Sequence, residues 1–329
     1  METNTRSDQS WRCCCDNNLN HHPITPRPAN VAGLFVCKDI IMFYDDNDAD
    51  TLNLTTMLTD QASRFCSEQR DKKAVSIVVH DWEYLYDKVR YGQYRHREGE
   101  AAERKIRWPF HRIVAGAWAI IDFPADGALP VVTRVEVLDR RACGDVEIVE
   151  HFFAALNTHP NAIPVSWGGE FKDLQVLRMV ASVHGLRLPR ALRMLSPFSP
   201  DRADLNMATA TKGHLVHLPE YARACDIPTK AVSSKDIGPA ALAGDWPTVH
   251  EQVLSDIFTI SIIAARHLAS HGLVSPIGPH CDAAILDAFI EAFPVSPFLT
   301  VACGGWAAHR RSVAADRLTS AATGLRRMA

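Results

Sequence analysis

Apolar residues fall along the chain in two patterns, short dense runs that are typical of buried strands and stripes that repeat with helical spacing. The dense runs occupy residues 75–84, 111–121, 131–138 and 163–167. A turn that contains Pro124 and Gly127 separates the second run from the third. We interpret the connections between the first three strands as too short for crossover helices, so we expect an antiparallel meander.

Helical spacing predicts helices over 145–156, 171–184, 247–271 and 281–293, with a short helix over 218–225. The longest of these carries an apolar stripe made of Val249, Val253, Ile257, Ile260, Ala264 and Leu268. A meander followed by a helix, a strand and further helices predicts an α/β fold in which helices flank a mixed sheet.

The remaining composition divides the chain of 329 residues into four regions. They are a disordered tail, an N-terminal appendage, a main domain, and a C-terminal helical extension that ends in a tail, with bounds at 1–32, 33–72, 73–273 and 274–329. Within the appendage the pattern predicts strands at 33–37 and 40–44 and a helix at 54–69. A hydrophobic content of 47% is enough to give the main domain a sizeable core.

The charge of the chain limits its partners. A formal net charge of −3 argues against a large non-specific nucleic-acid surface and leaves room for a small site that binds a nucleic-acid end. Charge is dense in residues 87–107, which we interpret as a solvated insertion; if nearby carboxylates bind metal and phosphate, its arginines could also steer an anionic strand toward them. The arginine-rich C-terminal end is interpreted as a solvated tail.

Cysteine usage and hydropathy point to the cytoplasm. Nine cysteines occur without a C-x-x-C pair, so neither a zinc knuckle nor a disulfide framework is expected, and free thiols indicate a reducing compartment. The first residues lack an apolar signal-peptide core, and we expect no run long enough to span a membrane.

Two carboxylates end the first predicted strand, in the sequence Val-Val-His-Asp-Trp-Glu-Tyr at residues 78–84. Alternate side chains of a strand point to the same face, so Asp81 and Glu83 would project together. Two like charges held this close repel unless a cation lies between them, which favours a metal site. The alternative is a strand that runs out into a solvated acidic loop, because short motifs often occur by chance.

Further carboxylates favour the metal site. Asp173 falls in the first turn of the helix predicted over 171–184. Asp256 lies at the edge of the apolar stripe of the helix predicted over 247–271. A carboxylate at such an edge is unfavourable unless it is paired or coordinates a cation, and the alternative is a solvated helix residue.

The order of these motifs resembles that of the DEDD superfamily of 3′–5′ exonucleases, and within it the predicted exonucleases related to the proofreading domain of family-B DNA polymerases. Residues 78–84 resemble the family's strand that ends in Phe-Asp-Ile-Glu-Thr, and Phe-His-Arg-Ile-Val at 110–114 resembles its Phe-His-Lys-Ile-Val strand. Residues 168–177, Gly-Gly-Glu-Phe-Lys-Asp-Leu-Gln-Val-Leu, resemble the second motif, and residues 252–257 match the third loosely. The resemblance covers roughly residues 73–272.

Two connecting segments extend the resemblance. Ala-Asp-Leu at 203–205 is similar to the family's Asp-Leu segment, and residues 218–230 are similar to its Ala-x-x-x-Gly-Ile-Pro-Gly-Lys segment.

The resemblance implies an RNase H-like fold and a two-metal reaction. The implied ligands of two Mg²⁺ or Mn²⁺ ions are Asp81, Glu83, Asp173 and Asp256. The implied activity is a metal-dependent 3′–5′ exonuclease that removes nucleotides from the ends of single-stranded nucleic acid, with DNA favoured over RNA and no membrane involved.

The third motif departs from the family at the residue that activates water. Where the family has tyrosine, four positions before the last aspartate, this chain has Gln252, whose amide can hydrogen-bond a water but cannot accept its proton. Glu251 or His250 could act as a substitute base. The second motif has Gly168 in place of asparagine. The alternative function is therefore a degenerate module that binds nucleic acid or a protein partner without turnover.

Overall fold

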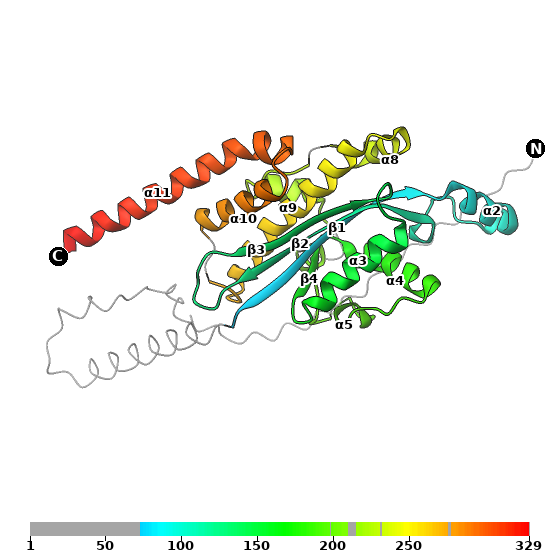
Figure 1. Cartoon of the computed structure of the whole chain (residues 1–329), viewed down its shortest axis with the longest axis horizontal. Coiled ribbons are helices and arrows are strands. Elements are labelled where there is room, and N and C mark those ends of the chain that lie inside the picture. The colour runs from blue at the N-terminus through cyan, green and yellow to red at the C-terminus, as the bar shows by residue number, and fades with distance from the viewer. Residues whose placement is uncertain (1–72, 198, 210–214, 231, 276–277, 329) are drawn as a thin grey trace, which may run out of the picture. The chain divides into compact units, whose positions relative to one another are not determined.

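A five-stranded mixed sheet lies at the centre of the protein (Figure 1). In this computed structural model the described residues are 73–197, 199–209, 215–230, 232–275 and 278–328, all within one unit that spans Cys66–Ala329. The tail, the strands and the helix expected before residue 73 lie outside the described residues. The strands are β1 (Val75–Tyr86), β2 (His111–Phe123), β3 (Val131–Asp139), β4 (Ile163–Ser166) and β5 (Ala203–Asp204).

The order of the strands is β3-β2-β1-β4-β5. β1 is antiparallel to β2, and β2 to β3, whereas β4 is parallel to both β1 and β5. An antiparallel meander extended by two parallel strands is an RNase H-like arrangement. The predicted fold class is therefore confirmed, and the four strands expected from the sequence correspond to β1 through β4.

β1 extends beyond the end of its parallel neighbour, β4, so β4 covers only part of that edge of β1. Pairing with β4 ends at Val79, opposite Val165, while β1 continues to Tyr86 and pairs with β2 along its whole length. Beyond Val79, no described strand adds to the edge of β1 that faces away from β2. We call residues 80–86 on this side the open edge of β1. Side chains there can meet residues from helices and turns.

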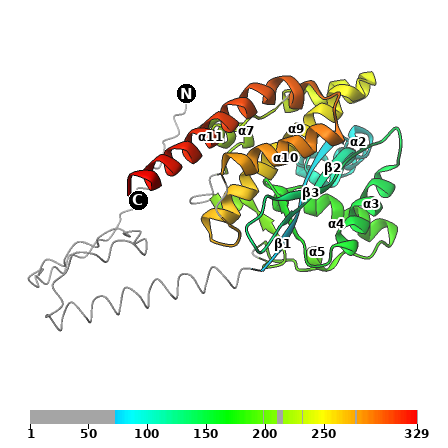
Figure 2. The same ribbon diagram turned by 60° about the vertical axis from the view of Figure 1, so that its left-hand side comes forward.

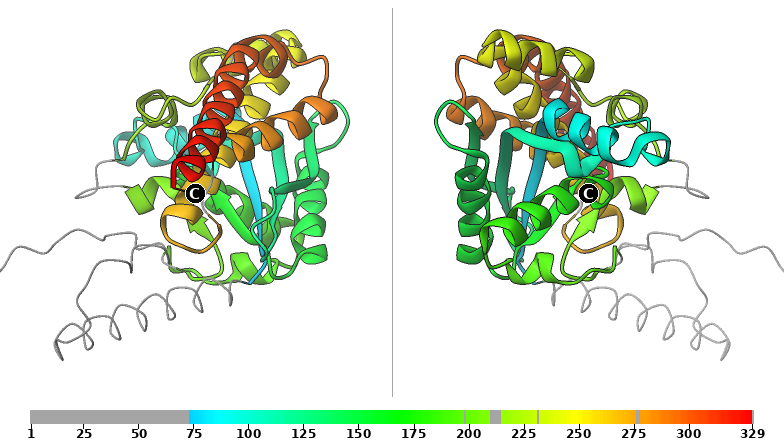
Figure 3. Two further views of the ribbon diagram at one scale, coloured as in Figure 1. Left: turned by 90° about the vertical axis from the view of Figure 1, so that its left-hand side faces the viewer. Right: turned by 90° about the vertical axis from the view of Figure 1, so that its right-hand side faces the viewer.

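Helices cover both faces of the sheet (Figures 2 and 3). In chain order they are α2 (Lys88–Glu98), α3 (Asp145–Thr158), α4 (Asp173–His184), α5 (Arg190–Arg193), α6 (Leu205–Thr209), α7 (Leu218–Ala224), α8 (Ser234–Ala243), α9 (Trp246–Ser270), α10 (Pro279–Ala292) and α11 (Cys303–Met328). Short 3₁₀ and π turns occur at η1 (Gly99–Ala101), η2 (Trp108–Phe110), η3 (Gly169–Phe171) and η4 (Phe298–Ala302).

Each face of the sheet has its own core. Val78 of β1 packs with Trp118 and with α3 and α4 on one face. Ile77 of β1 packs with α9 and α10 on the other, where Phe289 is fully buried. Neighbouring residues of β1 thus face opposite layers, as expected of a central strand that is buried on both sides.

His80 and Trp82, which flank Asp81 on β1, are packing residues. Both are buried, and Trp82 Nε1 donates to His80 Nδ1 at 3.0 Å. Burial lowers the pKa of His80 to about 3, so this imidazole is neutral and can accept that hydrogen bond. The Trp82 ring lies over Gly116 of β2, where an added Cβ would be only 2.4 Å from the ring. This close approach anchors β1 between the two acidic positions.

α9 corrects the expectation that no run is long enough to span a membrane. It has 25 residues, and an 18-residue stretch within it has a mean hydropathy of 1.3, which satisfies length and composition. In the structure, however, 78% of that stretch is buried inside the protein. A helix that is apolar on most sides is also what the centre of a large core requires, and α9 occupies that place.

The C-terminal end is also different from the expected solvated tail. Residues Cys303–Met328 form α11, and Arg310 pairs with Asp282 of α10 at 2.6 Å. Asp282 is fully buried, and Arg266 of α9 donates to it at 2.8 Å. Two guanidinium groups thus tie α9 and α11 to a single carboxylate on α10. The sequence pattern missed this because the partners lie on three different helices.

Candidate metal centre

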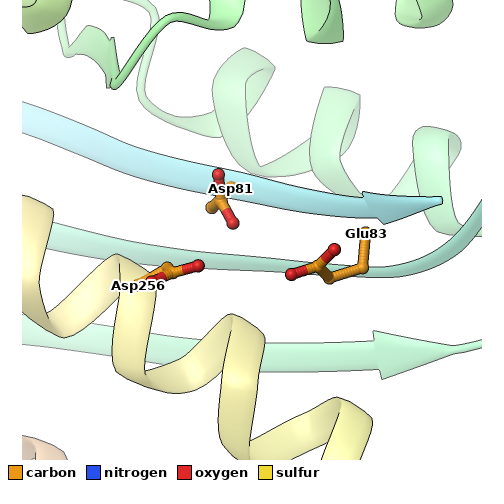
Figure 4. Close-up of side chains that lie close together, drawn as sticks. All are labelled: Asp81, Glu83 and Asp256. Atoms are coloured by element: carbon orange, nitrogen blue, oxygen red, sulfur yellow. The ribbon is translucent and has the colours of Figure 1, made fainter. Parts of the chain in front are cut away.

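Three carboxylates from two elements meet at the open edge of β1 (Figure 4). Asp81 and Glu83 alternate with Trp82 and lie on the face of the sheet that packs against α9. Asp256 projects toward them from the middle of α9. One oxygen of each carboxylate lies within 4.8 Å of the others. This spacing suits a cation that binds oxygen at about 2.0 to 2.6 Å.

Asp256 has the surroundings of a metal ligand. Its side chain is 6% exposed. Gln252, one helical turn earlier, donates from Nε2 to Asp256 Oδ2 at 2.7 Å, while the backbone N–H of Val232 donates to Gln252 Oε1 at 3.0 Å. Among the described residues, Asp256 Oδ1 has no hydrogen-bond partner. A buried carboxylate oxygen without a donor is unfavourable, so the residues present fit a hard divalent cation.

Asp173 lies beside this group and is held by two side chains. It begins α4 and is 3% exposed. The hydroxyl of Tyr84 donates to Asp173 Oδ1 at 2.9 Å. Lys172 Nζ lies 3.8 Å from the same oxygen and 4.7 Å from the centre of the Tyr84 ring. The charge of Asp173 also acts on Asp81, so all four predicted carboxylates share one electrostatic environment although three form the close group.

A tight turn before α4 positions Asp173. Gly168 has a φ of +77°, in the left-handed region that glycine adopts without strain. At Gly169, an added Cβ would lie 2.5 Å from Ser166 Oγ and 3.3 Å from Asp173 Oδ2. Asp204 of β5 accepts the backbone N–H of Gly168 at 2.8 Å and so ties the turn to the sheet. Glycine in place of the family's asparagine therefore suits the local backbone.

Burial and mutual repulsion raise the pKa of the carboxylates. For Asp81, burial is the largest cause, and the charges of Asp256, Asp173 and Glu83 add to it. The pKa of Glu83 rises to about 8 and that of Asp256 to about 6, in both cases chiefly because of burial. The cation-free group thus retains protons near neutral pH, and a divalent cation would displace them.

His250 and Glu251, which the sequence suggested as substitute bases, have other partners. His250 Nε2 contacts the carboxylate of Asp139 at the end of β3. Glu251 Oε1 accepts the hydroxyl of Ser296 at 2.8 Å and the backbone N–H of Phe298. Both residues line a cavity of about 1010 Å³ beside η4, and none of the four carboxylates lines it. The structure therefore does not bring either residue into the acidic group.

Three residues at the site were not singled out from the sequence: Tyr84, Lys172 and Lys230. The first two adjoin predicted ligands, Glu83 and Asp173, so adjacency to a motif was the available signal. The ammonium group of Lys230 lowers the pKa of both Glu83 and its partner carboxylate on α9. Its signal was its place at the end of the segment that resembles the family's Ala-x-x-x-Gly-Ile-Pro-Gly-Lys.

Comparison with known proteins gives partial structural likenesses. No known protein-family profile matches the sequence, and no curated protein matches it. The family B DNA polymerase of the archaeon Pyrobaculum calidifontis is similar with a TM-score of 0.41 and 14% identity, over 69% of this chain and 27% of the polymerase. E. coli exonuclease I in complex with a dT13 oligonucleotide is similar with a TM-score of 0.35 and 12% identity, over 60% of this chain and 41% of the exonuclease.

A product-bound structure of exonuclease I is similar to the same extent, with a TM-score of 0.36 and 12% identity, over 60% of this chain and 44% of that one. The chain thus spans less than half the length of each of these proteins. At scores and identities this low, the likeness carries no conclusion about function.

Proposed function

We propose that this protein is a metal-dependent 3′–5′ exonuclease of the DEDD type that acts on the ends of single-stranded nucleic acid. The proposal depends on one observation, the unpartnered Oδ1 of Asp256 within a group of three carboxylate oxygens that lie within 4.8 Å of one another. The RNase H-like sheet supports it, because Asp81 and Glu83 lie on the central strand. Mg²⁺ or Mn²⁺ is the proposed metal, DNA the favoured substrate, and the cytoplasm the proposed location.

The chain's own residues would prepare the site in distinct ways. Asp81, Glu83 and Asp256 would hold one cation, and Asp173 would contribute to a second. When bound, two such ions supply an activated water and stabilise the charge that develops on the leaving 3′ oxygen. Tyr84, through its hydrogen bond at 2.9 Å, fixes the orientation of Asp173.

The two lysines beside the carboxylates would bind the anionic substrate. Lys172 is held over the Tyr84 ring at 4.7 Å, and the charge of Lys230 reaches Glu83 and Asp256. Fixed positive groups that flank a reacting phosphate stabilise its additional charge in the transition state. They also keep part of the carboxylate cluster ionised before a cation arrives.

The test is degradation of a single-stranded oligonucleotide with Mn²⁺, labelled at the 5′ end in one sample and at the 3′ end in another. Wild-type protein should give a ladder that shortens from the 3′ end, and a 3′ label should be released as a mononucleotide. Asp81→Asn should abolish both. Asp287→Asn is the matched control, because Asp287 is an exposed aspartate of α10 paired with Arg311. Equal cleavage by both variants would refute the proposal.

A second candidate is a module that binds nucleic acid without turnover. One observation favours it: both polar atoms of the Gln252 side chain are used, one by Val232 and the other by Asp256, so this side chain is not free to hold an attacking water. Oligonucleotide binding by folded protein without cleavage, across Mg²⁺ and Mn²⁺ and both DNA and RNA, would establish this candidate in place of the first.

A further inference from the structure

A row of aromatic rings leads from Asp173, beside the acidic group, to the end of β1. Tyr84, which is hydrogen-bonded to Asp173, lies with its ring centre 5.5 Å from that of His111. His111 in turn lies 5.1 Å from Tyr86. Tyr86 is 55% exposed, although it is a large ring in the last position of a central strand. A ring held at its inner edge and exposed at its outer face is a ready stacking surface.

The segment that follows Tyr86 is strongly basic. Residues 88–107 carry seven Lys and Arg against three Glu, in a chain whose net charge is −3. Arg90 pairs with Asp87, and Arg107 with Glu103. The other five are exposed and form no ion pair within the described part of the chain. They are Lys88, Arg95, Arg97, Arg104 and Lys105.

This basic segment is anchored to the sheet. The backbone N–H of Asp87 donates to the carbonyl of Phe110 at 2.7 Å. Tyr91 and Tyr94 of α2 pack against the Phe110 ring, with ring centres 5.4 and 5.5 Å away. The Tyr91 hydroxyl donates to the carbonyl of Glu103 at 2.6 Å and closes the segment on itself. Its charges are therefore presented from a fixed place at the end of the β1–β2 pair, where Tyr86 lies opposite His111.

The ring row and the basic segment lie in sequence along one path. Tyr86 lies three positions after Glu83 along β1, about 10 Å at 3.3 Å per residue, and α2 begins at Lys88. Aromatic faces for bases, next to basic groups for phosphates, are the combination that binds single strands without sequence preference.

We infer that Tyr86 and the basic segment 88–107 form the binding surface for the part of a single-stranded nucleic acid that trails behind the 3′ end. Tyr86 stacks against a base, and the exposed lysines and arginines of the segment contact the phosphates beyond it. This inference rests on the proposed function for the position of the strand end, but it concerns binding, which is measured without cleavage.

The experiment measures the Kd of a labelled 15-nucleotide single strand by fluorescence anisotropy, on the full chain in chelator, at several salt concentrations. The first variant is Lys88→Glu/Lys105→Glu. Its matched control is Lys73→Glu/Arg187→Glu, which makes the same change in charge at exposed positions, before β1 and after α4. Loss of two phosphate contacts should raise Kd about tenfold and reduce the slope of log K against log salt by about 1.4, with little change in the control.

Tyr86 is tested separately from charge. Tyr86→Ala should weaken binding by about tenfold, and Tyr86→Trp should restore it, since stacking requires a ring and tolerates a change of ring. Val89→Ala is the control, because Val89 is 71% exposed and offers no ring. Wild-type binding by Tyr86→Ala, or equal losses in the two charge variants, would overturn the inference.

The same measurements separate this inference from the proposed function. Strand binding that depends on Tyr86 and the basic segment, without metal-dependent cleavage, would leave the inference standing and remove the exonuclease. Cleavage that survives every one of these substitutions with unchanged KM would support the exonuclease and overturn the inference. A protein that binds no single strand would overturn both.

Discussion

Neutralising Asp256 should stabilise the protein when no divalent cation is present. Its carboxylate is buried on α9, its pKa rises from 3.8 to about 6, and Oδ1 has no hydrogen-bond partner among the described residues. Asp256→Asn preserves the shape and leaves an amide oxygen that can accept the hydrogen bond from Gln252. The substitution therefore removes an unfavourable charge without creating a cavity.

The magnitude follows from the shift in the pKa of Asp256. Because the folded-state pKa lies above the unfolded one, the folded protein binds the proton more tightly, and stability falls as pH rises from about 3.8 to about 6. At pH 8 the ionised carboxylate costs about 3 kcal/mol, and at pH 4 about 0.5 kcal/mol. Removing this charge also relieves Asp81 and Glu83, for which Asp256 is the largest source of repulsion.

The assay is thermal or urea unfolding of wild type and Asp256→Asn in chelator at pH 4 and pH 8. The variant should be more stable by about 3 kcal/mol at pH 8, a rise in Tm of roughly 6 to 12 °C, and nearly unchanged at pH 4. Adding Mn²⁺ at a thousandfold excess over the wild-type Kd should reverse the order at pH 8, because wild type then gains about 4.1 kcal/mol of binding energy, more than the difference of about 3 kcal/mol.

Asp282→Asn is the matched control, since Asp282 is also a buried aspartate on a helix but has positively charged partners. It is paired with Arg266 and Arg310, so its neutralisation should destabilise the protein at both pH values. The reasoning is refuted if Asp256→Asn is less stable than wild type at pH 8 in chelator, or if its gain in stability is the same at pH 4 and pH 8.

Three further predictions concern the supporting residues. Tyr84→Phe removes the hydrogen bond that lowers the pKa of Asp173, so the Mn²⁺ concentration for half-maximal cleavage should rise about tenfold at pH 7 and less at pH 9; metal titration at the two pH values would expose an error in this sign. His250→Asn should leave the pH dependence of cleavage unchanged, because its imidazole is bound to the end of β3; loss of the acidic limb in a pH–rate profile would show instead that it is the base. Arg310→Met should lower the free energy of unfolding by about 3 kcal/mol in urea titration, without changing cleavage at 25 °C, and an unchanged midpoint would contradict the role given to this ion pair.

Much of the fold could be read from local pattern. The dense apolar runs became β1 to β4, and the helix expected over 247–271 became α9, because burial on a sheet or against one imposes its period on the residues that are buried. Two acids at positions i and i+2 of a strand must share a face, so the local sequence was also enough to predict that Asp81 and Glu83 lie close together.

The C-terminal region was harder to predict. α11 has a weak apolar pattern, and the buried partner of Arg310 lies on another helix, α10. The sequence of α11 therefore predicts an arginine-rich tail. The charge pattern of residues 88–98 likewise predicts a solvated insertion, whereas in the structure they form α2, whose Tyr91 packs on Phe110. Ion pairs and ring contacts between elements leave no period in the sequence.

The sequence by itself determined which carboxylates were available and that Asp256 would be strained without a partner. Only the tertiary structure decided which groups meet them. The backbone N–H of Val232, twenty positions earlier, occupies the amide oxygen of Gln252, and the carboxylate of Asp139, 111 positions earlier, binds His250. Contacts over such separations depend on how the layers pack and not on spacing along the chain. The acidic group could therefore be predicted from the sequence, whereas the partners of His250, Glu251 and Gln252 could not.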